Sequence, residues 1–131
     1  MNDNVTRIVA VRHGQTAWNA ATRIQGQLDI GLDDTGRAQA RRLAAALAGE
    51  DIDAVYASDL QRAADTARAV AERLGLALHT APSLRERAFG TFEGLTWAEV
   101  EQHHPEASRR WRERDPEFGP PGGEPLRLFF E

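Results

Sequence analysis

The triplet Arg12-His13-Gly14 comes directly after a short apolar segment, Ile8–Val11. A continuous apolar run rich in β-branched residues is typical of a strand buried on both faces of a parallel sheet. In open α/β sheets, ligands bind beyond the carboxyl ends of such strands. At such an edge, Arg12 can donate charge-assisted hydrogen bonds to an anion, and His13 can act as a nucleophile or base. Gly14 leaves room for the backbone to approach a ligand closely. The alternative is that Arg12 and His13 are solvated residues after a strand.

A second candidate anion site follows another predicted strand, Asp53–Ala57. Ser58 or Asp59 is expected to cap the next helix, and Arg62 lies in the first turn of that helix. A helix N-terminus with an arginine beside it binds anions readily. Two strand ends that each present an arginine to one edge of the same sheet would hold a phosphate between them. The alternative is that Arg62 pairs with Asp59 or Asp65 on the helix surface, a contact that stabilises little.

A third candidate is Glu86, which lies between Arg85 and Arg87. If its carboxyl group reaches the same cleft, it can protonate a leaving oxygen. The alternative is an ordinary ion pair with the flanking arginines on the surface. All sixteen basic residues of the chain are arginine, so composition says nothing about the function of any one of them. Only the position of each arginine in the fold can indicate its function.

The elements that must position these residues alternate between strands and helices. The cap sequence Asp34-Thr35-Gly36 is followed by apolar residues at helical spacing up to Gly49, and Leu60–Leu74 repeats this pattern before Gly75. Leu76–His79 looks like a third strand. The order β-α-β-α-β predicts an α/β fold with a mainly parallel sheet and helices on its faces.

The rest of the chain is less regular. Residues 82–94 are expected to form loops, Thr96 to cap a helix through about His103, and Pro105–Arg114 to form another helix. Trp97 and Trp111 are expected to be helix residues that pack on the sheet or cover loops, the alternative being a stacking platform for bases, and the arginines near residue 110 are expected to be solvated. Pro125 is expected to begin a last helix with Leu126, Phe129 and Phe130 on one face.

Composition excludes several classes of protein. The length of 131 residues suits one domain, predicted over residues 1–131, and the absence of cysteine excludes disulfide scaffolds, thiolate zinc sites and cysteine nucleophiles. The net charge of −4 argues against a nucleic-acid partner. No apolar run is long enough to cross a bilayer, and the N-terminus lacks the features of a signal peptide. We therefore expect no membrane partner and a cytoplasmic location; the oligomeric state is left open.

Several ordered motifs together resemble the histidine phosphatase superfamily, which has the phosphoglycerate-mutase-like fold. The resemblance implies a three-layer α/β/α sandwich. It also predicts that this domain is incomplete at its C-terminus, because family members carry a second histidine in a Ser-His-Gly-like context, which His79, His103 and His104 all lack. The matching motifs are Val11-Arg12-His13-Gly14-Gln15-Thr16-x-x-Asn19, Arg23-x-Gln25-Gly26-x-x-Asp29, Leu32-x-x-x-Gly36-x-x-Gln39-Ala40, Ser58-Asp59-Leu60-x-Arg62-Ala63-x-x-Thr66-Ala67, Leu84-Arg85-Glu86, Gly90-x-x-Glu93-Gly94 and Gly122-Gly123-Glu124.

The resemblance also implies roles for individual residues. His13 would attack phosphorus and become phosphohistidine, and Glu86 would be the proton donor. Arg12 and Arg62 would neutralise charge on the phosphoryl oxygens, so that neither a metal nor another cofactor is expected. The predicted substrate-binding residues are Arg12, Asn19, Gln25, Gly26 and Arg62. The region of Arg109 and Arg110 can form a lid over the substrate in the family, so the resemblance offers substrate contact as the alternative to a solvated face for these two arginines.

The predicted function is hydrolysis of a small phosphorylated metabolite through phosphohistidine. One alternative is a cofactor-dependent phosphoglycerate mutase, but those enzymes typically have Thr-Gly after Arg-Phe where this chain has Arg23-Ile24-Gln25-Gly26. They also have Asn-Glu-Arg-His-Tyr-Gly around the acid, where this chain has Arg85-Glu86-Arg87-Ala88-Phe89-Gly90. Another alternative is a phosphate-binding fragment without activity, although such a fragment would need neither His13 nor Glu86.

Overall fold

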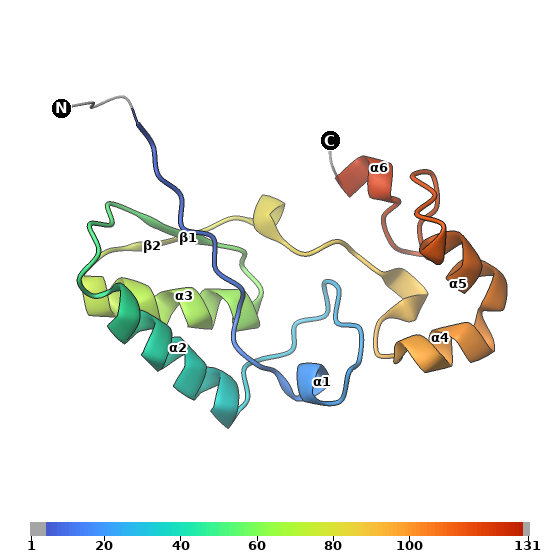
Figure 1. The fold of residues 1–131 in the computed structure, drawn as a ribbon, viewed down its shortest axis with the longest axis horizontal. Coiled ribbons are helices and arrows are strands. Elements are labelled where there is room, and N and C mark those ends of the chain that lie inside the picture. The colour runs from blue at the N-terminus through green and yellow to red at the C-terminus, as the bar shows by residue number, and fades with distance from the viewer. Residues whose placement is uncertain (1–4, 130–131) are drawn as a thin grey trace.

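A computed structural model describes residues 5–129 of the chain (Figure 1). Two short strands and several helices make up the described structure. In chain order they are α1 (Ala17–Ala20), α2 (Asp34–Leu47), β1 (Val55–Ala57), α3 (Gln61–Leu74), β2 (Leu78–Thr80), the 3₁₀ turns η1 (Pro82–Leu84) and η2 (Gly90–Phe92), α4 (Trp97–His103), α5 (Pro105–Arg112) and α6 (Leu126–Phe129). None of these helices is both long and apolar enough to span a membrane.

The parallel pair of strands confirms the predicted α/β organisation. Val55 pairs with Leu78 and Ala57 with Thr80 in a parallel register. Helix α3 connects the two strands and packs against both, while α2 packs along α3 (Figure 1). Helix α3 ends at Gly75, whose φ of +69° is a left-handed conformation that favours glycine.

The predicted strand Ile8–Val11 is wrong for the described structure. These residues form no strand, and Ile8 is 82% exposed. A parallel strand exists only through hydrogen bonds to a neighbouring strand. Nothing in residues 5–129 pairs with Ile8–Val11. The apolar run therefore has the composition of a buried strand but lacks the partner that would make it one.

Residues 89–128, which we call the C-terminal lobe, pack around a hydrophobic core. Its core consists of Phe92, Val100 and Phe118 together with Ile24 from the earlier part of the chain. Trp111 packs against this core. The predicted cap of α4 is confirmed, because Thr96 accepts a hydrogen bond from the Glu99 N–H. The last predicted helix is present as the short α6, and Phe130, placed on its apolar face, lies outside the described residues.

The two tryptophans of the C-terminal lobe are helix residues, as predicted, but they pack on each other and on nearby aromatic rings rather than on the sheet, and Trp97 stays 45% exposed. The rings of Trp97 and Trp111 lie 5.1 Å apart, and Trp111 also lies 5.3 Å from Phe89. The Arg87 guanidinium sits 4.6 Å from the Trp111 ring and donates to the Glu124 carbonyl oxygen at 2.7 Å. Arg87 thus attaches the lobe to the segment that carries Glu86.

Candidate active site

The loop Arg12–Thr16 is held against the beginning of α2. The side-chain amide of Gln15 donates to Asp33 at 2.9 Å. Asp33 also caps α2 by accepting from the Gly36 N–H, so the predicted cap at Asp34-Thr35-Gly36 is wrong by one residue and Asp34 is already helical. A Cβ on Gly14 would lie 2.6 Å from the Gly36 carbonyl oxygen, so the two backbones are in direct contact and leave no room for a side chain. This contact between two glycines sets where His13 sits.

His13 is half-buried and oriented for use of its Nε2 atom. Its Nδ1 lies 2.6 Å from the Gly14 carbonyl oxygen. Because a carbonyl only accepts, Nδ1 carries the proton and Nε2 is left with a free lone pair in the neutral ring. Burial lowers the pKa of His13 below 6.5; the positive charges of Arg62 and Arg12 lower it further, while the Gly14 carbonyl and Glu86 oppose the shift. The neutral, nucleophilic form is favoured.

Arg62 is a buried cation that touches no carboxylate. Only 3% of the residue is exposed, and it forms no ion pair with any of residues 5–129. Its guanidinium donates to the Leu28 carbonyl oxygen at 2.8 Å and to that of Gly26. A guanidinium has five N–H groups, so three of them stay available. Burial lowers the pKa of Arg62, yet an arginine stays charged, so a buried charge here favours an incoming anion.

Glu86 does not form the predicted alternative ion pair with its neighbours. Arg85 instead pairs with Asp59 through two 2.6 Å hydrogen bonds, and the Arg87 side chain points into the C-terminal lobe. One oxygen of the exposed Glu86 carboxylate accepts from the Arg87 N–H at 2.8 Å. Glu86 is close enough to His13 for its charge to influence the histidine's pKa.

Arg12 is exposed, and no side chain among residues 5–129 forms a hydrogen bond or ion pair with it. Its positive charge nevertheless contributes to lowering the pKa of His13, so the guanidinium lies within electrostatic range of the imidazole. The charges of Arg12, Arg62 and Glu86 thus all act on the His13 imidazole. They come from three segments far apart in the sequence.

Two other predicted site residues, Asn19 and Gln25, share a hydrogen-bonded network with Thr16. The Asn19 side-chain oxygen accepts from the Thr16 N–H at 3.0 Å and completes a capping box at the start of α1. The fully buried Thr16 hydroxyl donates to the Gln25 side-chain oxygen at 2.7 Å. Both amide oxygens are therefore occupied within the protein. Gly26 follows Gln25 with a φ of +55°.

The predicted cap of α3 by Ser58 or Asp59 is wrong. The helix begins after Leu60 without a capping side chain of its own, because Asp59 is taken by Arg85. Instead, Asp29 accepts a hydrogen bond from the Gln61 N–H at 2.7 Å. This bond holds the loop that ends at Asp29 against α3, the helix that carries Arg62. Asp29 belongs to one of the family-like motifs, but its partner is 32 residues away, so spacing alone could not assign this role.

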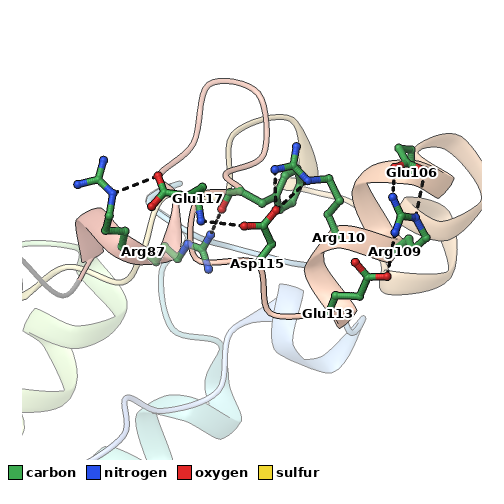
Figure 2. A network of polar contacts seen from close by, with 9 residues as sticks. Arg87, Glu106, Arg109, Arg110, Glu113, Asp115 and Glu117 are labelled. Carbon is green, nitrogen blue, oxygen red and sulfur yellow. Dashed lines mark hydrogen bonds and ion pairs between the residues drawn. The ribbon is translucent and has the colours of Figure 1, made fainter.

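Two other histidines, His79 and His104, and the two arginines Arg109 and Arg110 contact side chains outside the candidate site. His79 stacks on Tyr56 at 5.1 Å, and His104 lies 5.9 Å from the Phe92 ring. In Figure 2, Arg109 lies between Glu106 and Glu113, and Arg110 points to Asp115. Both arginines are thus neutralised by acidic neighbours, as expected of a solvated face. Within residues 5–129, no group of three or more potential ligands is arranged to hold a metal ion.

Comparison with known proteins identifies the family. The sequence profile of the histidine phosphatase superfamily, branch 1, matches residues 8–131. This chain belongs to the histidine phosphatase superfamily. Within that superfamily it is 45% identical to phosphoglycerate mutase-like protein 4 of Arabidopsis thaliana, over 88% of this chain and 51% of the relative. It is 44% identical to glucosyl-3-phosphoglycerate phosphatase of Mycolicibacterium vanbaalenii, over 92% of this chain and 53% of the relative.

Solved structures of the superfamily have the same fold. A mycobacterial glucosyl-3-phosphoglycerate phosphatase in complex with VO3 matches with a TM-score of 0.79 and 42% identity, over 86% of this chain and 54% of that one. The chain spans about half the length of the relatives it matches. The α/β fold predicted from the sequence is therefore confirmed as that of histidine phosphatases.

Proposed function

We propose that the protein hydrolyses a small phosphomonoester through a phosphohistidine intermediate. The observation that carries this proposal is the buried, carboxylate-free Arg62 within electrostatic range of His13, whose Nε2 is free and whose burial lowers its pKa and so favours the neutral ring. The pair offers a cationic site for a phosphoryl group and a nucleophile next to it. The names of relatives support the substrate class, since one is a glucosyl-3-phosphoglycerate phosphatase.

In the proposed reaction, Arg12 and the three unused N–H groups of Arg62 bind the phosphoryl oxygens, with the Asn19 amide assisting. His13 Nε2 attacks phosphorus, and the bond from phosphorus to the ester oxygen breaks. Glu86 gives its proton to that oxygen, which leaves as an alcohol. Glu86 then takes a proton from water, whose oxygen attacks phosphohistidine and releases inorganic phosphate and His13.

Gln25 and Gly26 are proposed as the substrate-facing part of the site. The Gly26 carbonyl already contacts Arg62, so a substrate bound to Arg62 comes close to this loop. The Gln25 oxygen is held by Thr16. Its amide nitrogen is the polar atom that would contact the substrate.

The test is hydrolysis of p-nitrophenyl phosphate by this chain without added metal, beside His13→Ala. Activity that is lost in the variant, together with a trapped acid-labile phosphohistidine, supports the proposal. Equal activity of the wild type and His13→Ala would contradict the proposed mechanism. Isomerisation of 3-phosphoglycerate primed by 2,3-bisphosphoglycerate, with negligible hydrolysis, would indicate a mutase instead. Binding of phosphate without turnover in either assay would indicate a phosphate-binding fragment.

A further inference from the structure

A single carboxylate oxygen, Glu93 Oε1, joins two loops of the candidate site. It accepts a hydrogen bond from the Gln27 N–H at 3.1 Å and another from the Phe89 N–H at 3.0 Å. Gln27 follows Gln25 and Gly26 in the substrate-facing loop, and Phe89 follows the segment that carries Glu86. Hydrogen bonds to a charged acceptor are about twice as strong as neutral ones, so this oxygen is a firm tie between the loops.

The same two loops are also joined by the side chain of Gln27. Its amide nitrogen donates to the Glu86 carbonyl oxygen at 3.1 Å. The backbone of the proton donor is thus bonded to the residue whose own N–H is held by Glu93. A displacement of Gln27 therefore moves Glu86.

Arg62 depends on the same loop from the other side. Its guanidinium donates to the carbonyl oxygens of Gly26 and Leu28, which flank Gln27. A Cβ on Gly26 would lie 2.2 Å from Glu93 Oε1, so the carboxylate sits directly against the backbone of this glycine. The negative charge of Glu93 also opposes the lowering of the Arg62 pKa by burial.

From these contacts we infer that Glu93 is a positioning residue, which sets the separation between Arg62 and Glu86 by holding the Gly26–Leu28 loop. It touches neither the phosphoryl group nor the leaving oxygen in the proposed reaction. The inference rests on the proposed function, because the separation of Arg62 and Glu86 affects the rate only if these two groups act on the same substrate. A misplacement of about 1 Å at a catalytic group costs on the order of 10²-fold in rate.

The experiment compares Glu93→Ala, Glu93→Gln and the matched control Glu101→Ala in the 131-residue chain. Glu101 is another glutamate of the C-terminal lobe, and within residues 5–129 its side chain forms a single ion pair, which is exposed, with Arg112. In p-nitrophenyl phosphate hydrolysis, we expect Glu93→Ala to lower kcat by about 10- to 100-fold with a smaller change in KM. Glu93→Gln keeps an oxygen that accepts both N–H groups and should recover most of kcat. Glu101→Ala should match the wild type.

A second readout separates positioning from folding and from the proposed activity. Orthovanadate affinity, measured by competition or calorimetry on samples shown by circular dichroism to be folded, should fall in Glu93→Ala and be restored in Glu93→Gln. A wild-type chain that binds vanadate without hydrolysing the ester would contradict the proposed function and leave this affinity comparison to decide the role of Glu93. The inference is overturned if Glu93→Ala binds vanadate like the wild type, if Glu101→Ala is equally impaired, or if the wild type binds no vanadate.

Discussion

The arginines of the C-terminal lobe and those of the candidate site differ in whether a carboxylate pairs with the guanidinium. In the lobe, Arg109 contacts Glu106 and Glu113, and Arg110 contacts Asp115 (Figure 2). In the site, neither Arg12 nor Arg62 contacts a carboxylate of residues 5–129. A guanidinium neutralised at the surface has little attraction left for a ligand, whereas a buried one without a counter-ion retains it. In a chain whose basic residues are all arginine, the surroundings decide the function.

The largest effect is expected for Arg62→Met, which removes the buried charge and keeps much of the volume. Loss of one such electrostatic contact lowers kcat/KM by roughly 10²- to 10³-fold. The matched substitution in the lobe, Arg110→Met, should leave kcat/KM unchanged because Asp115 already neutralises that arginine. Steady-state hydrolysis of p-nitrophenyl phosphate measures both. Equal losses in the two variants would remove the distinction between the two kinds of arginine.

A smaller effect is expected for Thr66, which supports the site from α3. Its hydroxyl oxygen accepts from the Gly14 N–H at 2.9 Å, and the hydroxyl donates to the Arg62 carbonyl oxygen at 2.7 Å. Thr66→Val leaves the buried Gly14 N–H without a partner, which costs about 1–3 kcal/mol in the free energy of unfolding. Urea denaturation measures this loss, and Thr66→Ser should restore most of it. If the Thr66→Val variant is as stable as the wild type, the hydrogen bond from Gly14 to Thr66 does not hold the His13 loop against α3.

The pH dependence tests whether the site arginines act on His13. Because burial and the positive charges of Arg62 and Arg12 lower its pKa, His13 stays neutral to a lower pH than an ordinary histidine. The acidic limb of kcat/KM should therefore lie below pH 6.5. Removing the charge in Arg62→Met should raise the pKa of His13, as followed by NMR titration of its ring protons, while Arg110→Met should not. A pKa that falls or stays fixed in Arg62→Met would contradict the arrangement.

The smallest effect is expected for Arg109→Ala in the lobe. Its partners Glu106 and Glu113 are exposed, and water screens such pairs. We expect Tm and kcat/KM to equal those of the wild type, as measured by calorimetry and the same hydrolysis assay. A marked loss of activity would instead revive the role of this arginine as a substrate contact.

Local sequence patterns predicted the helices well. The apolar stripe that ends at Gly75 predicted α3, and Thr96 predicted the start of α4. These features depend on residues within a turn or two of one another, so spacing along the chain contains the information. The strand at Ile8–Val11 failed for the opposite reason, because a strand depends on a partner that the pattern itself does not contain.

The sequence by itself determined the α/β class and the chemistry available: a histidine after an apolar run, arginines near two predicted strand ends, and a glutamate between arginines. Only the tertiary structure decided how these groups are held. Asp29 reaches across 32 residues to cap α3, and Glu93 reaches across 66 to Gln27. It also decided that Arg62 is buried without a carboxylate partner while Arg109 is paired at the surface. Burial and long-range hydrogen bonds depend on which distant segments meet, and no local pattern contains that information.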